Sequence, residues 1–407
     1  MVQKTLGDIS TFITKGATPT TYGYKWQAFG VPFLRSECVS SHGLDLRQSM
    51  FISESADQAL RRSRVKDGDI LMTITGNVGR VVRLRGVGSA NINQHIARIR
   101  VKDGTFDSGF IYHLLSQQSM REYYESIVTG QAYPQISLTQ VRSTLVPETG
   151  IREQQAIASA LDDADDLIGT LERLLAKKRS IVHGMRQELL TGRTRLPGFD
   201  SPWTPMAVAA RSVMKARIGW QGLKTDEYRT SGDYRLVGGT DFVDGRVNWQ
   251  TTPYVDKWRF DQDQYIQLRV GDVLLTKDGS IGKTAYVDAL PGPATLNSGV
   301  FVIRPIRDAY DPRFFYLMLR SRAFADFLGR LSAGSTISHL YQRDLVTLVL
   351  DVPPSLEEQQ AIAGVLLEAE QEIVVVRRQL AKANSIKQGM MQQLLTGRVR
   401  LPMEDAA

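Results

Sequence analysis

The chain has 407 residues, which is more than one hydrophobic core usually supports, so two or more domains are expected. Its hydrophobic share of 42% and charged share of 23% are typical of a soluble globular protein and exclude a fibrous or disordered chain. The formal net charge of +7 suits a polyanionic partner such as nucleic acid, although an ordinary basic protein has the same balance.

Cysteine usage and apolar runs indicate the compartment. Cys38 is the only cysteine, so an internal disulfide is impossible, which fits a reducing environment. Lys4 and Asp8 lie near the N-terminus and no apolar run follows them, so no signal peptide is expected. No stretch approaches the roughly 20 apolar residues that a membrane-spanning helix needs. These features predict a cytoplasmic protein.

Four segments follow one another along the chain. We expect a first domain at 1–150, a long helix at 151–195, a second domain at 196–352 and a second long helix at 353–402. Both domains carry the same series: a strand-like run with a Gly-Asp turn, an asparagine segment, an aromatic helix-like stretch and a glycine. The members of this series are Val65 to Gly79, Asn91 to His95, Phe110 to Tyr124 and Gly130, then Leu268 to Gly282, Asn297 to Ser298, Phe314 to Phe327 and Gly334.

The long helices are duplicated. Residues 154–197 and 359–402 align without a gap, and over half of their positions are identical. The upstream domains have diverged much further, which indicates a common scaffold that presents two different recognition domains.

Apolar residues in both helices alternate spacings of four and three, which predicts a coiled-coil seam. The first seam runs through Ile157, Leu161, Ala164, Ile168, Leu171, Leu175, Val182, Met185 and Leu189, and the second through Ile362, Leu366, Ala369, Ile373, Val376, Leu380, Ala383, Met390 and Leu394. Lys178 and Lys387 interrupt the seams in different layers. A Thr-Gly-Arg sequence closes each helix, and about 38 residues span roughly 57 Å.

Two such helices pair most simply with each other. An antiparallel pair would relate the two domains by a pseudo-twofold axis, which matches the twofold relation between DNA strands. An ordinary structural coiled coil is the alternative. The predicted fold class is α+β: two α/β domains separated by long antiparallel helices in a pseudo-twofold repeat.

Four segments resemble parts of the specificity subunits of type I restriction-modification enzymes. They are Glu357 to Ala363, Leu394 to Arg398, the turn Gly271 to Leu275 and the later Gly334 to Thr336. The likeness covers essentially the whole chain. The first half departs from it at Gly130-Gln131-Ala132 and at Ile151-Arg152-Glu153, and the segment Trp203 to Ala209 lacks the Leu-Gly-Asp-Ile found at Leu6 to Ile9.

The resemblance implies a non-catalytic chain in which each target recognition domain reads one half of a split, asymmetric DNA site while the helices set the spacer. It further implies docking of two modification subunits, which methylate adenine with S-adenosylmethionine, and of restriction subunits that use ATP and Mg. No cofactor is then expected on this chain.

A search for chemistry on the chain itself finds no complete motif. Asp278 to Thr284 resembles a phosphate-binding loop, but Lys277 occupies the position of its first glycine, so we interpret it as a turn. The five histidines and the cysteine lack metal-ligand spacing. A nuclease or methyltransferase with an unrecognised active site, and a coiled-coil adaptor that binds no DNA, are the alternatives.

Candidate DNA contacts are basic, amide, hydroxyl and aromatic side chains in polar stretches near predicted turns. In the first domain they are Thr18, Tyr22, Tyr24, Lys25, Arg35, Ser36, Asn93, Gln94, His95, Gln131, Tyr133 and Gln135. In the second they are Lys224, Tyr228, Thr240, Asn297, Ser298, Ser335, Thr336 and His339. Candidate phosphate contacts are Arg61, Arg62, Arg64, Lys257 and Arg259. Core aromatics, turn-building asparagines and a solvated arginine face are the alternative interpretations.

Overall fold

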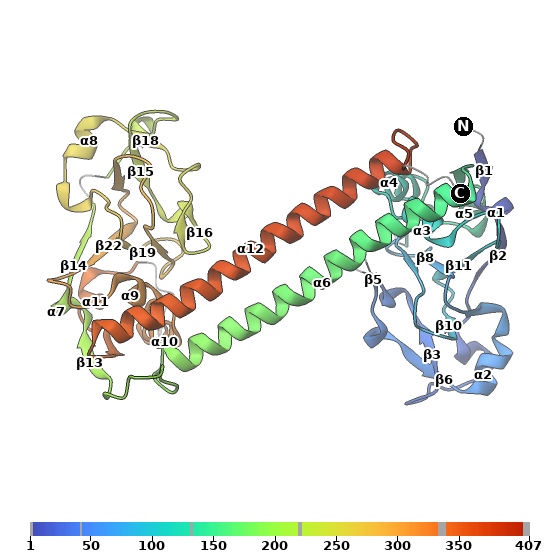
Figure 1. The fold of residues 1–407 in the computed structure, drawn as a ribbon, viewed down its shortest axis with the longest axis horizontal. Coiled ribbons are helices and arrows are strands. Elements are labelled where there is room, and N and C mark those ends of the chain that lie inside the picture. Colours follow the sequence, from blue (N-terminus) through green and yellow to red (C-terminus); the bar gives the residue numbers. More distant parts are fainter. Residues whose placement is uncertain (1–2, 41–42, 131–132, 219–221, 333–338, 402–407) are drawn as a thin grey trace, which may run out of the picture. The chain divides into compact units, whose positions relative to one another are not determined.

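The computed structural model describes residues 3–40, 43–130, 133–218, 222–332 and 339–401. The chain forms two compact units, one made of residues 1–173 with 378–407 and the other of residues 174–377. Each unit holds one globular domain and parts of two long helices, α6 (Ile151–Leu189) and α12 (Leu356–Leu394), which have 39 residues each (Figure 1). The predicted α+β class is confirmed.

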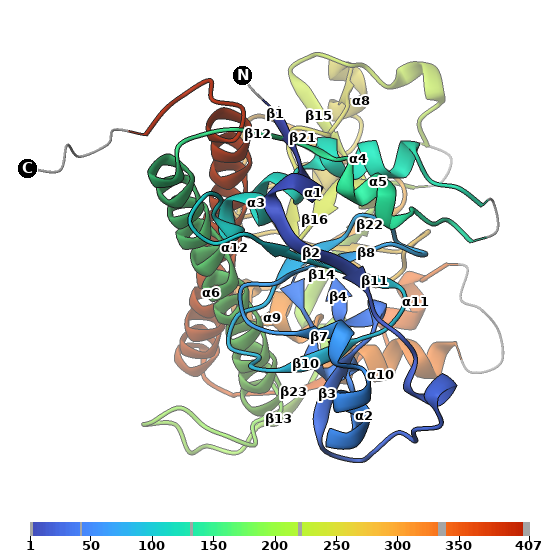
Figure 2. The same ribbon diagram turned by 90° about the vertical axis from the view of Figure 1, so that its right-hand side faces the viewer.

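The first unit contains two four-stranded sheets. One has the order β2-β11-β8-β9, and the other has the order β6-β3-β10-β7, in which β3 and β10 are parallel. Figure 2 shows β2, β11 and β8 side by side. The strands are β1 (Gln3–Thr5), β2 (Ser10–Lys15), β3 (Val31–Leu34), β4 (Val39–Ser40), β5 (Gly43–Leu44), β6 (Met50–Ile52), β7 (Arg64–Val65), β8 (Ile70–Thr73), β9 (Val81–Arg83), β10 (Ala90–Ile92), β11 (Ile96–Val101) and β12 (Leu145–Pro147). The helices are α1 (Leu6–Ile9), α2 (Glu54–Ala59), α3 (Ser108–Leu115), α4 (Gln118–Ser126) and α5 (Leu138–Arg142).

The second unit repeats this plan. Its larger sheet contains the order β14-β22-β19-β20, and its smaller sheet has the order β18-β15-β21 with β15 and β21 parallel. The strands are β13 (Thr204–Ala207), β14 (Ser212–Ala216), β15 (Tyr234–Val237), β16 (Phe242–Val243), β17 (Arg246–Val247), β18 (Tyr254–Val255), β19 (Val273–Thr276), β20 (Thr284–Tyr286), β21 (Ala294–Leu296), β22 (Val300–Pro305) and β23 (Val349–Val352). The helices are α7 (Val208–Arg211), α8 (Lys257–Asp261), α9 (Pro312–Met318), α10 (Arg322–Leu331) and α11 (Gln342–Leu345).

The two aromatic stretches were each predicted as one helical segment, and each is two helices. In the first unit, α3 ends at Leu115 and α4 starts at Gln118, with Gln117 in an extended conformation between them. Helix α3 buries its apolar residues, including Phe110 at 1% exposure, whereas the polar run that follows has no core to face. The chain therefore turns at that polar run.

The repeated Gly-Asp turn is structural in both domains. Asp69 is 1% exposed and accepts two hydrogen bonds of 2.6 Å from the guanidinium of Arg100. Asp272 is 3% exposed and accepts bonds of 2.6 and 2.7 Å from Arg304. A buried carboxylate needs such a bidentate partner, so this pair accounts for the Asp in each copy of the motif.

The predicted apolar seam residues are buried or half-buried along both long helices. Residues Leu161 and Leu366 are 0% exposed and belong to the cores of the first and second units respectively. The polar interruptions of the seam are ion-paired with the facing helix: Lys387 lies 2.5 Å from Asp165, and Lys178 lies 2.6 Å from Glu372.

The helices run antiparallel within each unit. In the first unit, residues early in α6 pair with residues at or beyond the end of α12, as in the 3.7 Å contact between Glu153 and Arg400. In the second unit, Arg195 beyond the end of α6 pairs with Glu358 at the start of α12 at 2.7 Å. These two ion pairs are equivalent in the sequence repeat, which is what a pseudo-twofold duplication requires.

A buried glutamine fixes the start of each long helix to the domain before it. Gln154, which is 0% exposed, accepts a 2.9 Å bond from the amide of Asp107 and donates 2.7 Å to the carbonyl of Thr149. Gln359, at 2% exposure, accepts 2.8 Å from the amide of Asp311 and donates 2.9 Å to the carbonyl of Pro353. In both domains the glutamine joins the helix start to the residue that caps α3 or α9.

Replacing this glutamine should therefore destabilise the fold. Gln359→Ala leaves the Asp311 amide and the Pro353 carbonyl buried without partners, and we expect a loss of about 2–3 kcal/mol in the free energy of unfolding. Urea unfolding followed by circular dichroism measures it. Gln360→Ala, at the exposed neighbouring position, is the matched control. Equal stability of the two variants would contradict the structural role of Gln359.

Candidate nucleic-acid interface

Two parallel strands organise the polar surface of each domain. In the first, β3 and β10 align Leu34 with Ile92, and the amide of Asn93 donates 3.1 Å to the Leu34 carbonyl. In the second, β15 and β21 align Val237 with Leu296. Because parallel strands end at the same edge, the segments that follow them meet there. This edge brings Arg35 and Ser36 beside Asn93 to His95.

A glycine-bounded turn lies beside this edge, and the edge and the turn form the first and second walls of a polar pocket. Strands β8 and β9 are joined by a turn in which Gly76 and Gly79 adopt φ of +77° and +79°, a region that favours glycine. The Thr73 hydroxyl bonds to the carbonyl of Asn77 and accepts 3.0 Å from the amide of Arg80. The sequence-based interpretation of the matching segment Asp278 to Thr284 as a turn is confirmed, since it joins β19 to β20 with the same geometry.

The segment after Gly130 forms the third wall. The amide of Gly76 donates 2.8 Å to the Pro134 carbonyl, and the amide of Ile136 donates 3.0 Å to the Ile74 carbonyl. In the second domain the amide of Leu340 donates 2.8 Å to the Lys277 carbonyl. The same three walls therefore meet in both domains.

In the first domain these walls enclose a pocket of about 610 Å³. Seven of the predicted contacts line it: Thr18, Arg35, Ser36, Asn93, Gln94, His95 and Tyr133. The sequence reasoning missed other polar residues of its lining, namely Glu37, Thr75, Asn77 and Arg80, and the aromatic Trp26. The repeated glycine turn could have pointed to Arg80, because the residue after its second glycine is basic in both halves.

Hydrogen bonds orient the amide residues of this pocket. The Thr18 hydroxyl donates 2.6 Å to Oε1 of Gln94, and Nε2 of Gln94 lies 3.1 Å from Nε2 of His95. Oδ1 of Asn93 accepts 3.1 Å from the amide of His95, so this asparagine builds the turn. Gln94 and His95 are therefore held in place at the pocket wall.

Other first-domain candidates lie outside this pocket. Tyr22 (60% exposed), Lys25, Arg61, Arg62 and Gln135 are exposed, whereas Tyr24 packs beside a small apolar core. Arg64 pairs with the buried Asp57 at 2.5 Å, which is an intradomain role. Gln131 lies outside the described residues.

The second domain assembles fewer of its candidates. Nδ2 of Asn297 donates 3.0 Å to the Tyr228 hydroxyl, and Oδ1 of Asn297 accepts 2.7 Å from the amide of Ser298. His339 pairs with Asp278 of the glycine turn. Lys224 and Thr240 are exposed on neighbouring segments. Ser335 and Thr336 lie outside the described residues.

The two basic candidates on α8 have carboxylate partners within the domain. Lys257 pairs with Asp261 one helical turn away. Arg259 donates bonds of 2.7 and 2.8 Å to the two carboxylate oxygens of Glu227, and this guanidinium lowers the pKa of Glu227 from 4.5 to about 2. The bidentate geometry indicates that Arg259 holds the 224–229 segment against α8.

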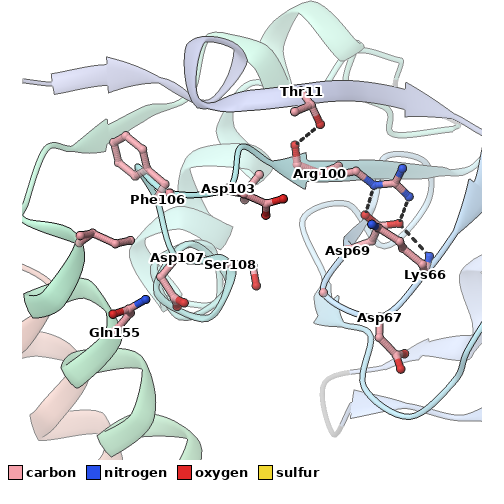
Figure 3. A pocket seen from close by; sticks show the side chains of 14 residues that line it. Thr11, Lys66, Asp67, Asp69, Arg100, Asp103, Phe106, Asp107, Ser108 and Gln155 are labelled. Atoms are coloured by element: carbon pink, nitrogen blue, oxygen red, sulfur yellow. Dashed lines mark hydrogen bonds and ion pairs between the residues drawn. The ribbon is translucent and has the colours of Figure 1, made fainter.

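A second pocket of the first domain is predominantly acidic. It measures about 300 Å³ and is lined by four carboxylates, Asp67, Asp69, Asp103 and Asp107, against two cations, Lys66 and Arg100 (Figure 3). Asp69 is already paired with Arg100, and Asp107 caps α3. The remaining charge repels phosphate, so this pocket is unsuited to DNA.

Among the residues that the structure describes, no group of three or more His, Cys, Asp or Glu side chains is placed to hold a metal ion. None of the described helices is long and apolar enough to cross a membrane. Cys38 is 0% exposed, and burial raises the pKa of its thiol, which disfavours the reactive thiolate.

The two domains therefore repeat one arrangement of strands and turns with different polar side chains at its edge. A family model described as "Type I restriction modification DNA specificity domain" matches residues 1–177 and 219–382. The chain therefore belongs to this family of type I restriction-modification specificity proteins.

Individual relatives agree with this membership, and a solved structure shares the fold. A putative type I restriction enzyme MjaX specificity subunit from Methanocaldococcus jannaschii is 22% identical over 97% of this chain and 93% of its own. The MjaVIII specificity subunit of the same organism is 24% identical over 83% and 80%. The crystal structure of an S subunit from M. genitalium shares the fold with a TM-score of 0.66, at 15% identity over 97% of this chain and 95% of that one.

The Glu227–Arg259 pair predicts an acid-dependent stability. Because folding lowers the pKa of Glu227 from 4.5 to about 2, its stabilisation is complete above about pH 4.5 and is lost as the pH falls toward 2. Glu227→Gln should therefore melt below the wild type at pH 6, with a gap that narrows below pH 4.5 in calorimetry. Asp261→Asn, which removes an exposed pair, is the control. A gap that is the same at every pH would contradict this assignment.

Proposed function

We propose that this chain is a non-catalytic DNA-specificity subunit of a type I restriction-modification system. Residues 1–150 and 196–352 each read one half of a split, asymmetric site, and the helices at 151–195 and 353–402 set the unread spacer. Membership of the DNA specificity family and the names of the similar subunits from Methanocaldococcus jannaschii support this proposal.

The proposal rests on one observation: the two domains share an arrangement of strands and turns but carry different side chains at its edge. Strand pairing makes Asn93 equivalent to Asn297, yet Gln94-His95 stand where the second domain has Ser298-Gly299. Arg35 likewise stands where the second domain has Gly238. Base edges are distinguished by their donor and acceptor patterns, so walls with different donors and acceptors suit different half-sites.

Within the first domain, the pocket residues Arg35, Gln94 and His95 are our proposed base readers. Glutamine amides pair with adenine and arginine guanidinium groups pair with guanine. On binding DNA, Gln94 exchanges its contacts with Thr18 and His95 for a base edge, and Arg35 exchanges its contact with the Gln48 carbonyl. The exposed cations Lys25, Arg61 and Arg62 are proposed phosphate contacts.

The partners follow from the same proposal. Two modification subunits dock on the chain and methylate adenine with S-adenosylmethionine, and restriction subunits add ATP- and Mg-dependent cleavage. A solved structure with a TM-score of 0.52 to this chain, at 17% identity over 98% of both chains, comes from work on assembly of the type I restriction-modification system. The chemistry then belongs to those partner chains.

Exchanging the second domain tests whether the domains read independently. A hybrid in which residues 196–352 come from a relative of different specificity should methylate, with its modification subunit, a motif changed in one half only. Sequencing methylated adenines in DNA treated with the reconstituted complex measures this. The chain alone, as a control, should transfer no methyl group. A hybrid motif changed in both halves would refute independent reading.

Lengthening both helices tests the spacer. One heptad added to α6 and one to α12 extends the antiparallel pair by roughly 10 Å, or about three base pairs. We expect the gap in the methylated motif to grow by about that amount while both half-sites stay the same. Insertion of two residues, which turns the apolar seam away from the facing helix, is the control and should abolish activity. A gap of unchanged length would contradict the role of the helices.

A further inference from the structure

A basic residue occupies the same place in both domains, although several of the side chains around it differ. Arg80 follows the second glycine of the β8–β9 turn, and Lys283 follows the second glycine of the β19–β20 turn. Neither was among the sequence-based candidates. The inference below rests on the proposed function and deepens it.

A buried threonine positions the backbone of each basic residue. The Thr73 hydroxyl accepts 3.0 Å from the Arg80 amide, and the Thr276 hydroxyl accepts 2.9 Å from the Lys283 amide. Both threonines are 1% exposed, and each also bonds to a carbonyl within its turn. The two basic residues are therefore presented from turns of equal geometry.

Both side chains extend toward the edge where the parallel strands end. Arg80 lines the pocket together with Arg35 and Ser36. Nζ of Lys283 lies 3.4 Å from the carbonyl of Gly239, which is the residue equivalent to Ser36. The two cations thus occupy one place relative to the shared frame.

Both cations keep free donors. Among the described residues neither has a carboxylate within ion-pair distance, and Nε of Arg80 is buried without an acceptor. The single contact of Lys283 is long for a hydrogen bond, and an ammonium has two further protons. Two cationic groups without carboxylate partners at the same edge of each domain favour an anionic ligand there.

The comparison of the two domains assigns that ligand. Groups that differ between the domains suit bases, because the half-sites differ, whereas a group common to both suits what every half-site has in common. Asn93 and Asn297 are also common to both domains, but their amide groups are uncharged, and their Oδ1 atoms accept backbone amides and so build the turn. The phosphodiester backbone is the same in every half-site and carries the matching charge.

We infer that Arg80 and Lys283 are equivalent phosphate anchors, one in each domain, which set the position of a DNA strand against the base-reading wall. Such an anchor contributes affinity and a salt dependence without base preference. Removal of a base-reading arginine would instead make the protein lose its base preference at one base pair of the DNA site.

The test is equilibrium DNA binding by the full chain as wild type, Arg80→Ala and Lys283→Ala. Two probes are used: the duplex carrying the methylated motif and a mixed-sequence duplex of equal length, from roughly 50 to 200 mM salt. Each variant should bind both probes about tenfold more weakly, and its slope of log K against log salt should fall by about 0.9. The base preference measured with singly substituted duplexes should not change.

Matched variants separate anchoring from total charge and from folding. Lys66→Ala and Arg269→Ala remove equivalent exposed cations from the Gly-Asp turns outside the proposed interface and should change binding by less than about twofold. Arg80→Lys and Lys283→Arg keep the charge and should restore the salt slope.

Several outcomes would overturn the assignment. Loss of discrimination at one base pair would make Arg80 or Lys283 a base reader. An unchanged salt slope, or equal losses in the Lys66 and Arg269 variants, would remove the anchor. If the wild-type chain bound neither duplex, with or without its modification subunit, the proposed function itself would fail.

Discussion

The bond from a buried glutamine at the start of each long helix to the domain before it is the constraint on which the other features depend. Gln154 and Gln359 join the helix backbone to the residues that cap α3 and α9, while Leu161 and Leu366 enter the same cores. The start of each helix is thereby part of the core of the domain before it.

Both domains share one arrangement of strands and turns, the frame, and they have diverged in the side chains along its edge. The parallel strand pair, the Gly-Asp turn with its bidentate arginine and the glycine turn occur twice with matching geometry. Side chains at the edge of the frame differ, as Gln94 and Ser298 illustrate. A recognition protein gains from this division, because base readers can change without disturbing the core that holds them.

Much of the fold follows from sequence because periodicity and repeats are local signals. The seam, its two lysine interruptions and the closing glycines, which adopt φ of +68° at Gly192 and Gly397, all follow from spacing. Side-chain partners depend on strand register, which spacing does not provide. The sequence also does not show which distant side chains meet: Arg259 was a predicted phosphate contact and is paired with Glu227, and Arg80 was predicted only as part of a turn and lines the pocket. Even at 203–209, where the short motif is missing, packing still produced the equivalent helix α7.

We propose that this chain directs a methylating complex to a bipartite DNA recognition site. The most direct measurement is genome-wide sequencing of methylated adenines in the host with and without this gene. The account predicts that deletion removes methylation from one bipartite motif, with unlike halves and a gap of fixed length, and that re-expression restores it. An unchanged methylation pattern, or loss of a continuous symmetric motif, would contradict it.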